Sequence, residues 1–121
     1  MPIGESGEMY LTTIMQLTEK EGPVRSLDIA NQMGFSRPSV SRAIKILREE
    51  RYIFVSGRGY ISLTESGMEI ARRISERHKV IRDFFISKGV DEEIAEKDAC
   101  RIEHIISEEG LLALKNCLER G

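Results

Sequence analysis

The chain has 121 residues, of which 40% are hydrophobic, 31% are charged and only 6% are aromatic. This length fits one small globular domain or two small lobes, and the scarcity of aromatic residues favours helices over an all-β fold. No run approaches the roughly 20 apolar residues that a membrane helix needs, and the first residues do not resemble a secretory signal. We therefore expect a cytoplasmic protein with two reduced cysteines.

Charge is distributed unevenly along the chain. The net charge of −2 argues against nucleic-acid binding by the molecule as a whole. However, residues 37–58 contain six basic side chains and only two acidic ones, whereas residues 65–121 contain ten basic and thirteen acidic ones. The local excess of positive charge predicts one surface that meets phosphates.

Three helices are predicted in the first third of the chain. Apolar residues at helical spacing predict a helix over about 7–20. A short second helix follows with Ser26 as its N-cap and ends at Gly34, and a third begins after the N-cap Ser36 with Pro38 in its first turn. The residues expected to face inward are Leu27, Ile29, Ala30 and Met33 in the second helix and Val40, Ala43, Ile44 and Leu47 in the third.

A β-hairpin is predicted next, because two β-favouring segments flank a Ser-Gly-Arg-Gly turn at 56–59. The spacing of Ala30, Gly34 and Val40 is typical of a helix–turn–helix: a small residue where the helices cross, a glycine in the turn and a core residue beyond it. We predict a mainly α fold that begins with a winged helix–turn–helix DNA-binding domain over residues 1–64.

Double-stranded DNA is the partner expected of such a domain, with the third helix in the major groove. The Arg42 guanidinium can pair with O6 and N7 of guanine. Serine hydroxyls suit phosphates or base edges, and Pro38 can contact a thymine methyl. Arg58 at the hairpin tip can reach a flanking phosphate or the minor groove. The candidate DNA-binding residues are Ser36, Arg37, Pro38, Ser39, Ser41, Arg42, Lys45 and Arg58.

The second half, residues 65–121, is predicted to be a helical domain. Thr64 caps a long helix over about 65–87, another helix runs over about 91–106, and Ser107 caps the last one. The final two helices carry more apolar side chains than so short a segment can bury. We therefore expect a homodimer formed from about residue 85 onwards and stable without metal. The apolar residues are Ile94, Ile102, Ile105, Ile106, Leu111, Leu112, Leu114 and Leu118.

A metal site is predicted in the same half. Cys100, Glu103 and His104 stand at positions i, i+3 and i+4, which share one face of a helix. A thiolate, a carboxylate and an imidazole together suit a divalent transition metal. The spacing does not match a four-ligand structural zinc site. Taken singly, the cysteine is also consistent with a small buried hydrophobe, and the other two with a surface pair.

Four segments resemble the metal-dependent repressors of the diphtheria toxin repressor (DtxR) and manganese repressor (MntR) family. They are Glu-Met-Tyr-Leu-Thr-Thr-Ile at 8–14, Ser-Arg-Pro-Ser-Val-Ser at 36–41, Leu-Thr-Glu-Ser-Gly at 63–67 and Asp-Ala-Cys-Arg-Ile-Glu-His at 98–104. The resemblance implies a homodimer that binds a palindromic operator when Fe(II) or Mn(II) is plentiful and represses metal-uptake genes. It is to a short form without the C-terminal SH3-like domain.

The resemblance also implies a ligand set. Met9 joins Cys100, Glu103 and His104 at the primary site of the iron-responsive branch. The manganese branch has carboxylates at the positions of Met9, Thr12 and Cys100. Since sulfur ligands favour later, softer metals, Fe(II) is expected, with Mn(II), Co(II), Ni(II) or Zn(II) as substitutes.

An ancillary site is implied around His78 and Glu96. Here the sequence departs from the iron-branch pattern, since Arg82 replaces an expected carboxylate and Glu96 an expected histidine.

Two other function classes stay open at this stage. One is a winged-helix regulator that senses a small organic ligand or the redox state without metal. The other is a hydrolase that uses Glu103 and His104 as acid and base. The sequence contains no nucleophile elbow, phosphate loop or HExxH motif, so we expect no enzyme.

Overall fold

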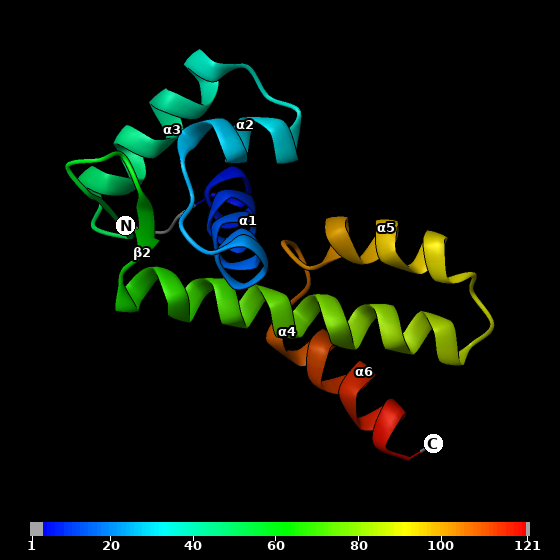
Figure 1. The fold of residues 1–121 in the computed structure, drawn as a ribbon. Helices are drawn as coiled ribbons and strands as arrows, with labels where there is room; N and C mark the ends of the chain where they lie inside the picture. Colours follow the sequence, from blue (N-terminus) through cyan, green and yellow to red (C-terminus); the bar gives the residue numbers. More distant parts are fainter. Residues whose placement is uncertain (1–3, 121) are drawn as a thin grey trace. The chain divides into compact units, whose positions relative to one another are not determined.

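The computed structural model describes residues 4–120, which are mainly helical. In this part of the chain there are six helices and one two-stranded antiparallel sheet (Figure 1). Contacts divide the chain into two compact units, residues 1–72 and 73–121. The predicted fold class, mainly α with a small hairpin, is confirmed.

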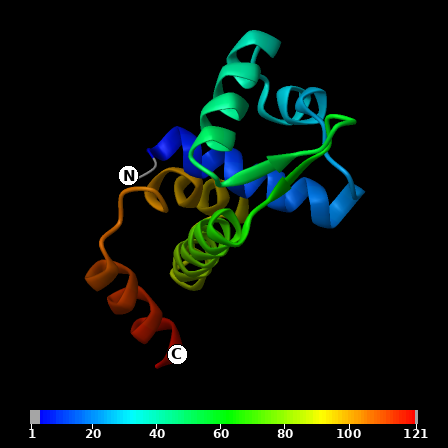
Figure 2. The same cartoon turned by 90° about the vertical axis from the view of Figure 1, so that its left-hand side faces the viewer.

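The first unit contains three helices followed by a hairpin. The elements are α1 (Glu5–Glu21), α2 (Ser26–Met33), α3 (Arg37–Glu49), β1 (Ile53–Val55) and β2 (Ile61–Leu63). Figure 2 shows the two strands as neighbouring arrows after α3. In the ladder, Ile53 pairs with Leu63 and Val55 with Ile61. The Ile61 N–H also donates to the Val24 carbonyl at 2.7 Å, which ties the segment before α2 to the hairpin.

The core of the first unit is aliphatic. Each burial of a side chain such as Leu or Ile contributes roughly 1.5–3 kcal/mol, so α1, α2, α3 and the hairpin stabilise one another through a shared apolar centre. Its largest fully buried members are Leu11, Ile14, Val24, Ile29, Val40 and Ile53.

The turn between α2 and α3 has the chemistry that the sequence predicts. Gly34 adopts a left-handed backbone with φ of 71°, which a glycine adopts without steric cost. The Ser36 hydroxyl accepts a hydrogen bond from the Ser39 N–H at 3.3 Å, so Ser36 is the N-cap of α3 as predicted. This turn sets the start of α3.

Two expectations for α2 are wrong. Ser26 is the first helical residue and Arg25 is the N-cap, because the Asp28 carboxylate accepts the Arg25 N–H at 2.9 Å and closes the first turn one residue earlier. Leu27 is 45% exposed instead of facing inward. The buried residues of the helix are Ile29 and Ala30.

The second unit contains the later part of α4 (Glu65–Ser87), together with α5 (Glu92–Ile102) and α6 (Glu108–Glu119). The predicted N-caps Thr64 and Ser107 are confirmed, since their hydroxyls accept the Gly67 and Gly110 N–H groups. The structure adds Asp91 as the N-cap of α5, where its carboxylate accepts the Glu93 N–H. No helix in the described residues is long and apolar enough to cross a membrane.

The predicted helix over 91–106 is too long. α5 ends at Ile102, and Glu103 is its C-cap. Beyond it the Ile105 and Ile106 N–H groups both donate to the Ile102 carbonyl, so the chain turns towards α6 instead of continuing the helix. His104 therefore lies just after the helix that carries Cys100.

Candidate functional site

The basic surface of the first unit lies on α3. All but one of the predicted DNA-binding residues are exposed, and the exception, Ser39, is half-buried. The Ser36 hydroxyl donates to the Ser39 hydroxyl at 2.9 Å, and the Arg42 guanidinium donates to the same oxygen at 3.4 Å. Ser39 therefore orients Arg42 instead of standing free to meet a base.

A hollow of about 240 Å³ adjoins this surface. It is lined by Ser26, Leu27, Arg37 and Ser41, so the start of α2 meets the start of α3 there. Two hydroxyls and a guanidinium suit a phosphate oxygen. Sequence reasoning missed Ser26 and Leu27, because it assigned the first to a cap and the second to the core.

The hairpin is tied to the start of α2 by a cation–π contact. The Arg25 guanidinium lies 4.5 Å from the centre of the Tyr60 ring. The Tyr60 N–H donates to the Ser56 hydroxyl at 3.1 Å across the turn that carries the exposed Arg58. These contacts fix the base of the predicted wing.

The second unit holds a cluster of titratable side chains centred on His78. Its Nδ1 lies 2.7 Å from Glu103 Oε2, and its Nε2 lies 2.7 Å from Glu96 Oε1. Cys100 Sγ is 3.9 Å from the same Nδ1. The structure thus brings together four of the predicted metal ligands, His78 from α4, Glu96 from the middle of α5, and Cys100 and Glu103 from its C-terminal end.

His104 joins the cluster through Glu103. Its Nε2 lies 3.3 Å from Glu103 Oε1, and its side chain is almost completely buried. Glu103 is buried as well. A buried carboxylate needs compensating donors or a cation, and here it lies between two imidazoles.

The surroundings of His78 and Cys100 raise the pKa values of both groups. The hydrogen bond to Glu103 raises the pKa of His78, against the effect of burial and with help from Glu96. Burial raises the pKa of the Cys100 thiol, and the charges of Glu103 and Glu96 raise it further. Both shifts favour the protonated forms of the imidazole and the thiol.

The donor set fits a divalent transition metal. It combines an imidazole, carboxylates and a thiol, whose protons a metal ion can replace. The side chains are joined as a chain of hydrogen bonds, and within residues 4–120 no three of them form a ready-made ligand group. Met9, the remaining predicted ligand, belongs to the first unit, where it is 38% exposed on α1 and its carbonyl accepts the Thr12 hydroxyl.

Arg82 modifies the Glu96 side of the cluster. One terminal nitrogen of its guanidinium lies 3.7 Å from Glu96 Oε2, and the other is 3.1 Å from Asp83. The carboxylate that hydrogen-bonds to His78 is thus already close to a positive charge. A second cation would be repelled there.

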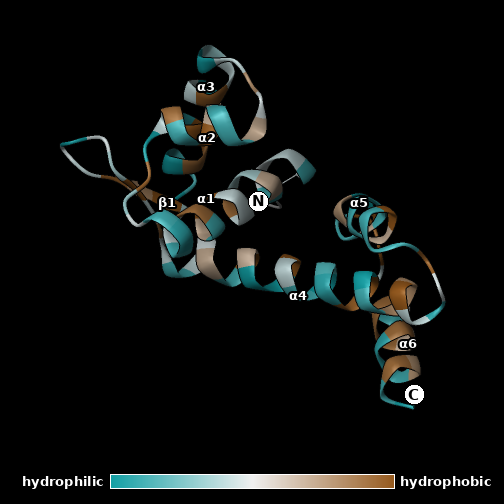
Figure 3. Ribbon diagram, turned by 45° about the vertical axis from the view of Figure 1, so that its right-hand side comes forward, coloured by the Kyte–Doolittle hydropathy of each residue, from teal (hydrophilic) through white to brown (hydrophobic). Residues whose placement is uncertain are grey.

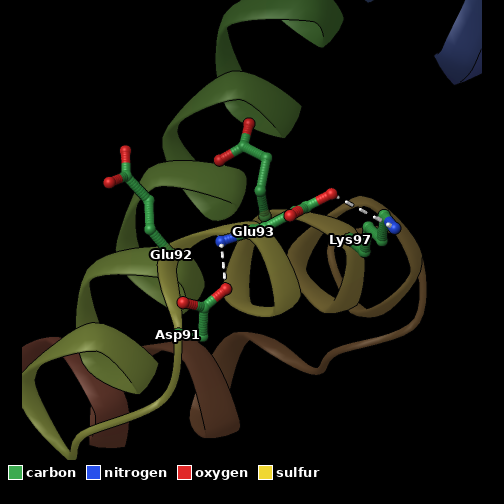
Figure 4. A pocket seen from close by; sticks show the side chains of 5 residues that line it. Asp91, Glu92, Glu93 and Lys97 are labelled. Atoms are coloured by element: carbon green, nitrogen blue, oxygen red, sulfur yellow. Dashed lines mark hydrogen bonds and ion pairs between the residues drawn. The ribbon is translucent and has the colours of Figure 1, made fainter.

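Glu96 also lines an acidic hollow of about 520 Å³ at the start of α5 (Figure 4). In this hollow the Asp91 carboxylate caps the helix, and Lys97 pairs with Glu93 at 3.7 Å. The other lining residue is Glu92.

A winged helix–turn–helix followed by a helical unit with a histidine–carboxylate–thiol cluster defines a class of DNA-binding regulator that responds to metal. The comparisons specify the family. Residues 3–60 match the iron-dependent repressor N-terminal DNA-binding domain, and residues 64–120 match the iron-dependent repressor metal-binding and dimerisation domain. The chain belongs to this family of transcriptional regulators, so the predicted resemblance is confirmed.

Individual relatives support the same family membership. The chain is 36% identical over 107 residues to the transcriptional regulator MntR of Escherichia coli, covering 88% of this chain and 68% of the relative. It is 32% identical to an uncharacterised HTH-type transcriptional regulator of Methanocaldococcus jannaschii, over 98% and 96% of the two chains. The T. acidophilum IdeR structure superposes with a TM-score of 0.82 at 26% identity. That match covers 98% of this chain and 55% of the solved one.

Proposed function

We propose that this protein is a metal-dependent repressor that binds palindromic operator DNA as a homodimer and controls metal-uptake genes in the cytoplasm. The observation that carries the proposal is the cluster around His78, placed in the part of the chain that matches a metal-binding and dimerisation domain. Residues 1–64 would serve as the DNA-binding domain and residues 65–121 as the sensing and dimerisation domain. The protein would act as a regulator and not as an enzyme.

Cys100, Glu103 and His104 would bind the activating metal, with Met9 as the further ligand that the family resemblance implies. When bound, the divalent cation supplies the positive charge that protons supply in its absence. His78 and Glu96 would form the ancillary site. Because Arg82 already lies beside Glu96, we propose that this second site depends less on a metal ion.

Fe(II) is the proposed physiological metal. A thiolate and a thioether bind Fe(II) better than Mn(II), and Co(II), Ni(II) and Zn(II) suit the same donors. Relatives with names from both the manganese and the iron branches match this chain, so Mn(II) is the main competitor. The sulfur donors of Cys100 and Met9 favour iron, whereas the overall similarity to these relatives does not distinguish the two metals.

For DNA, the exposed face of α3 would enter the major groove. Ser36, Arg37 and Pro38 stand at the N-terminal end of the helix, the end that reaches base edges in this motif. Arg42, oriented by Ser39, would read guanine, while Ser41, Lys45 and Arg58 would contact phosphates or neighbouring bases.

The decisive experiment is an operator-binding assay with and without chelator, repeated with Fe(II), Mn(II), Co(II), Ni(II) and Zn(II). Metal should strengthen binding at least about a hundredfold, a coupling free energy of roughly 2.7 kcal/mol. Equal binding in chelator would refute metal control and support the alternative regulator that senses an organic ligand or the redox state.

The same assay tests the recognition helix. Arg42→Ala should weaken binding to operator DNA by about 1–3 kcal/mol, the contribution of a bidentate base contact, and leave metal binding unchanged. Arg101→Ala, a matched loss of an exposed arginine in the second unit, should have no such effect. Equal losses on operator and random DNA would show that Arg42 contacts only phosphates.

A further inference from the structure

Arg77 is a nearly buried arginine beside the metal cluster. It precedes His78 on α4, and its side chain is only 12% exposed. One terminal nitrogen, Nη1, donates to the Ile106 carbonyl at 2.9 Å and to the Glu103 carbonyl at 3.3 Å. The other, Nη2, pairs with the Glu108 carboxylate. These acceptors all belong to the segment from the end of α5 to the start of α6.

This segment needs external donors. α5 ends at Ile102, and the last carbonyls of a helix have no partner within the helix. Arg77 satisfies the Glu103 carbonyl at the C-cap and the Ile106 carbonyl in the turn, and its ion pair with Glu108 reaches the first turn of α6. A single guanidinium therefore joins α4 to both ends of the α5–α6 connection.

The arrangement is costly. Burying a guanidinium requires good compensation, and Arg77 Nε is buried without a hydrogen-bond partner. A buried N–H donor without an acceptor destabilises the folded state. A short polar side chain in place of Arg77 would bury no such donor. The planar fork of arginine is instead suited to hold several acceptors in one fixed geometry.

We infer that Arg77 is a positioning residue for the metal centre: it fixes the backbone that carries Glu103 and His104 without touching the metal. The inference rests on the proposed metal site. Arg77 is always cationic and cannot be a ligand, so its effect passes through the backbone. Its bond to Glu108 extends the same anchoring to α6.

The first test uses metal-free protein. Hydrogen exchange of the Ile105 and Ile106 amides should accelerate about tenfold in Arg77→Gln, because charge-assisted hydrogen bonds that hold the turn are lost. Arg77→Lys should give an intermediate rate, since one ammonium cannot replace the fork. Arg72→Gln, a change of an exposed arginine on the same helix, is the matched control and should keep the native rates.

The second test uses Co(II) as a spectroscopic probe. Arg77→Gln should bind Co(II) about tenfold more weakly and alter the thiolate-to-Co(II) absorption, with partial recovery in Arg77→Lys. Glu108→Gln, which keeps both carbonyl contacts, should show a smaller effect and remains informative if Arg77→Gln fails to fold.

Native Co(II) affinity and spectrum in folded Arg77→Gln would overturn this inference alone. Wild-type protein that binds no Co(II) would overturn both the inference and the proposed metal site.

Discussion

The two ring nitrogens of His78 lie within hydrogen-bond distance of Glu96 and Glu103. Because ionised carboxylates only accept, both contacts are hydrogen bonds at the same time when His78 is an imidazolium. Such a cation neutralises part of the negative charge around it. A metal ion that binds the same carboxylates therefore has to displace protons that the cluster retains strongly. Proton release becomes part of metal binding.

Metal affinity should consequently rise with pH. The pKa values of Cys100 and His78 are both raised, so both groups are protonated over more of the neutral range than free side chains are. Lowering the pH from 8 to 6 should weaken Co(II) binding by at least about tenfold per pH unit, one proton per ion. Isothermal titration in two buffers of different ionisation enthalpy measures the proton count.

Cys117→Ala provides the control for this pH profile, because the exposed Cys117 lies outside the cluster. Its profile should match that of the wild type, whereas Cys100→Ala should lose most of its metal affinity. A flat profile in the wild type would show that the thiol does not bind as thiolate.

Cys100 should also decide which metal is preferred. Cys100→Glu replaces a soft donor with a hard one, so affinity for Fe(II) and Co(II) should fall relative to Mn(II). Competition titrations on the variant and on the wild type measure the ratio directly. If Cys100→Ala still binds operator DNA in a fully metal-dependent manner, Cys100 is not a ligand and the activating site lies around His78.

At the scale of elements, the join between the hairpin and α4 depends on Gly67. A Cβ added there would lie 2.1 Å from the Tyr52 carbonyl oxygen, which is backbone and cannot move aside cheaply. Gly67→Ala should therefore destabilise the first unit by about 3 kcal/mol, at the upper end of overpacking effects. Denaturant unfolding measures this change.

Gly57→Ala is the matched control for that substitution, since a Cβ at Gly57 meets nothing within 4 Å. It should leave the unfolding midpoint almost unchanged. Equal stability of the two variants would contradict the close packing of α4 against the loop before β1.

Local patterns in the sequence predicted most of these elements. Ser36, Thr64, Asp91 and Ser107 each act within three residues of the N–H that they cap, so their role is readable from spacing. The end of α5 was not readable, because the turn at 103–107 is completed by Arg77 from another helix. Propensity alone would continue the helix through Glu103.

The candidate site was predictable only where its residues stand close together in the sequence. Cys100, Glu103 and His104 stand close in sequence and were found from helical spacing, although the last lies beyond the helix. The contacts of His78 with Glu96 and Glu103 span 18 and 25 residues. Nothing in local spacing brings those side chains together, and only the family resemblance pointed to His78.

At the scale of the whole molecule, the second unit leaves large apolar side chains uncovered. Ile105 is 75% exposed, Leu112 and Ile94 are more than half exposed, and α6 has no buried residue. Figure 3 shows hydrophobic and hydrophilic residues alternating along α6, as in a helix with one apolar face. Where exposed apolar side chains gather into one patch, the patch is typical of protein–protein interfaces.

A homodimer that uses this surface should be weakened by charge. Ile105→Glu and Leu112→Glu should each raise the dimer dissociation constant at least about tenfold, since covering one such side chain contributes roughly 1.5–3 kcal/mol. Sedimentation at micromolar concentration without metal measures this shift. Phe54→Glu, a similar change at an exposed position in the first unit, should leave the dimer intact. A wild-type monomer would refute the proposed dimer.

A metal ion can control DNA binding only if the metal site is coupled to the DNA-binding unit. Met9 is the proposed ligand that belongs to that unit. Met9→Leu removes the thioether and keeps the size of the side chain. Co(II) should still bind the donors of the second unit, but the gain in operator affinity on adding metal should fall at least about tenfold, because a ligand shifts an equilibrium only by its differential affinity for the two states. Met33→Leu, on α2, should retain full coupling. Parallel measurement of Co(II) affinity and operator affinity separates the two effects, and unchanged coupling in Met9→Leu would place the link between the units in other residues.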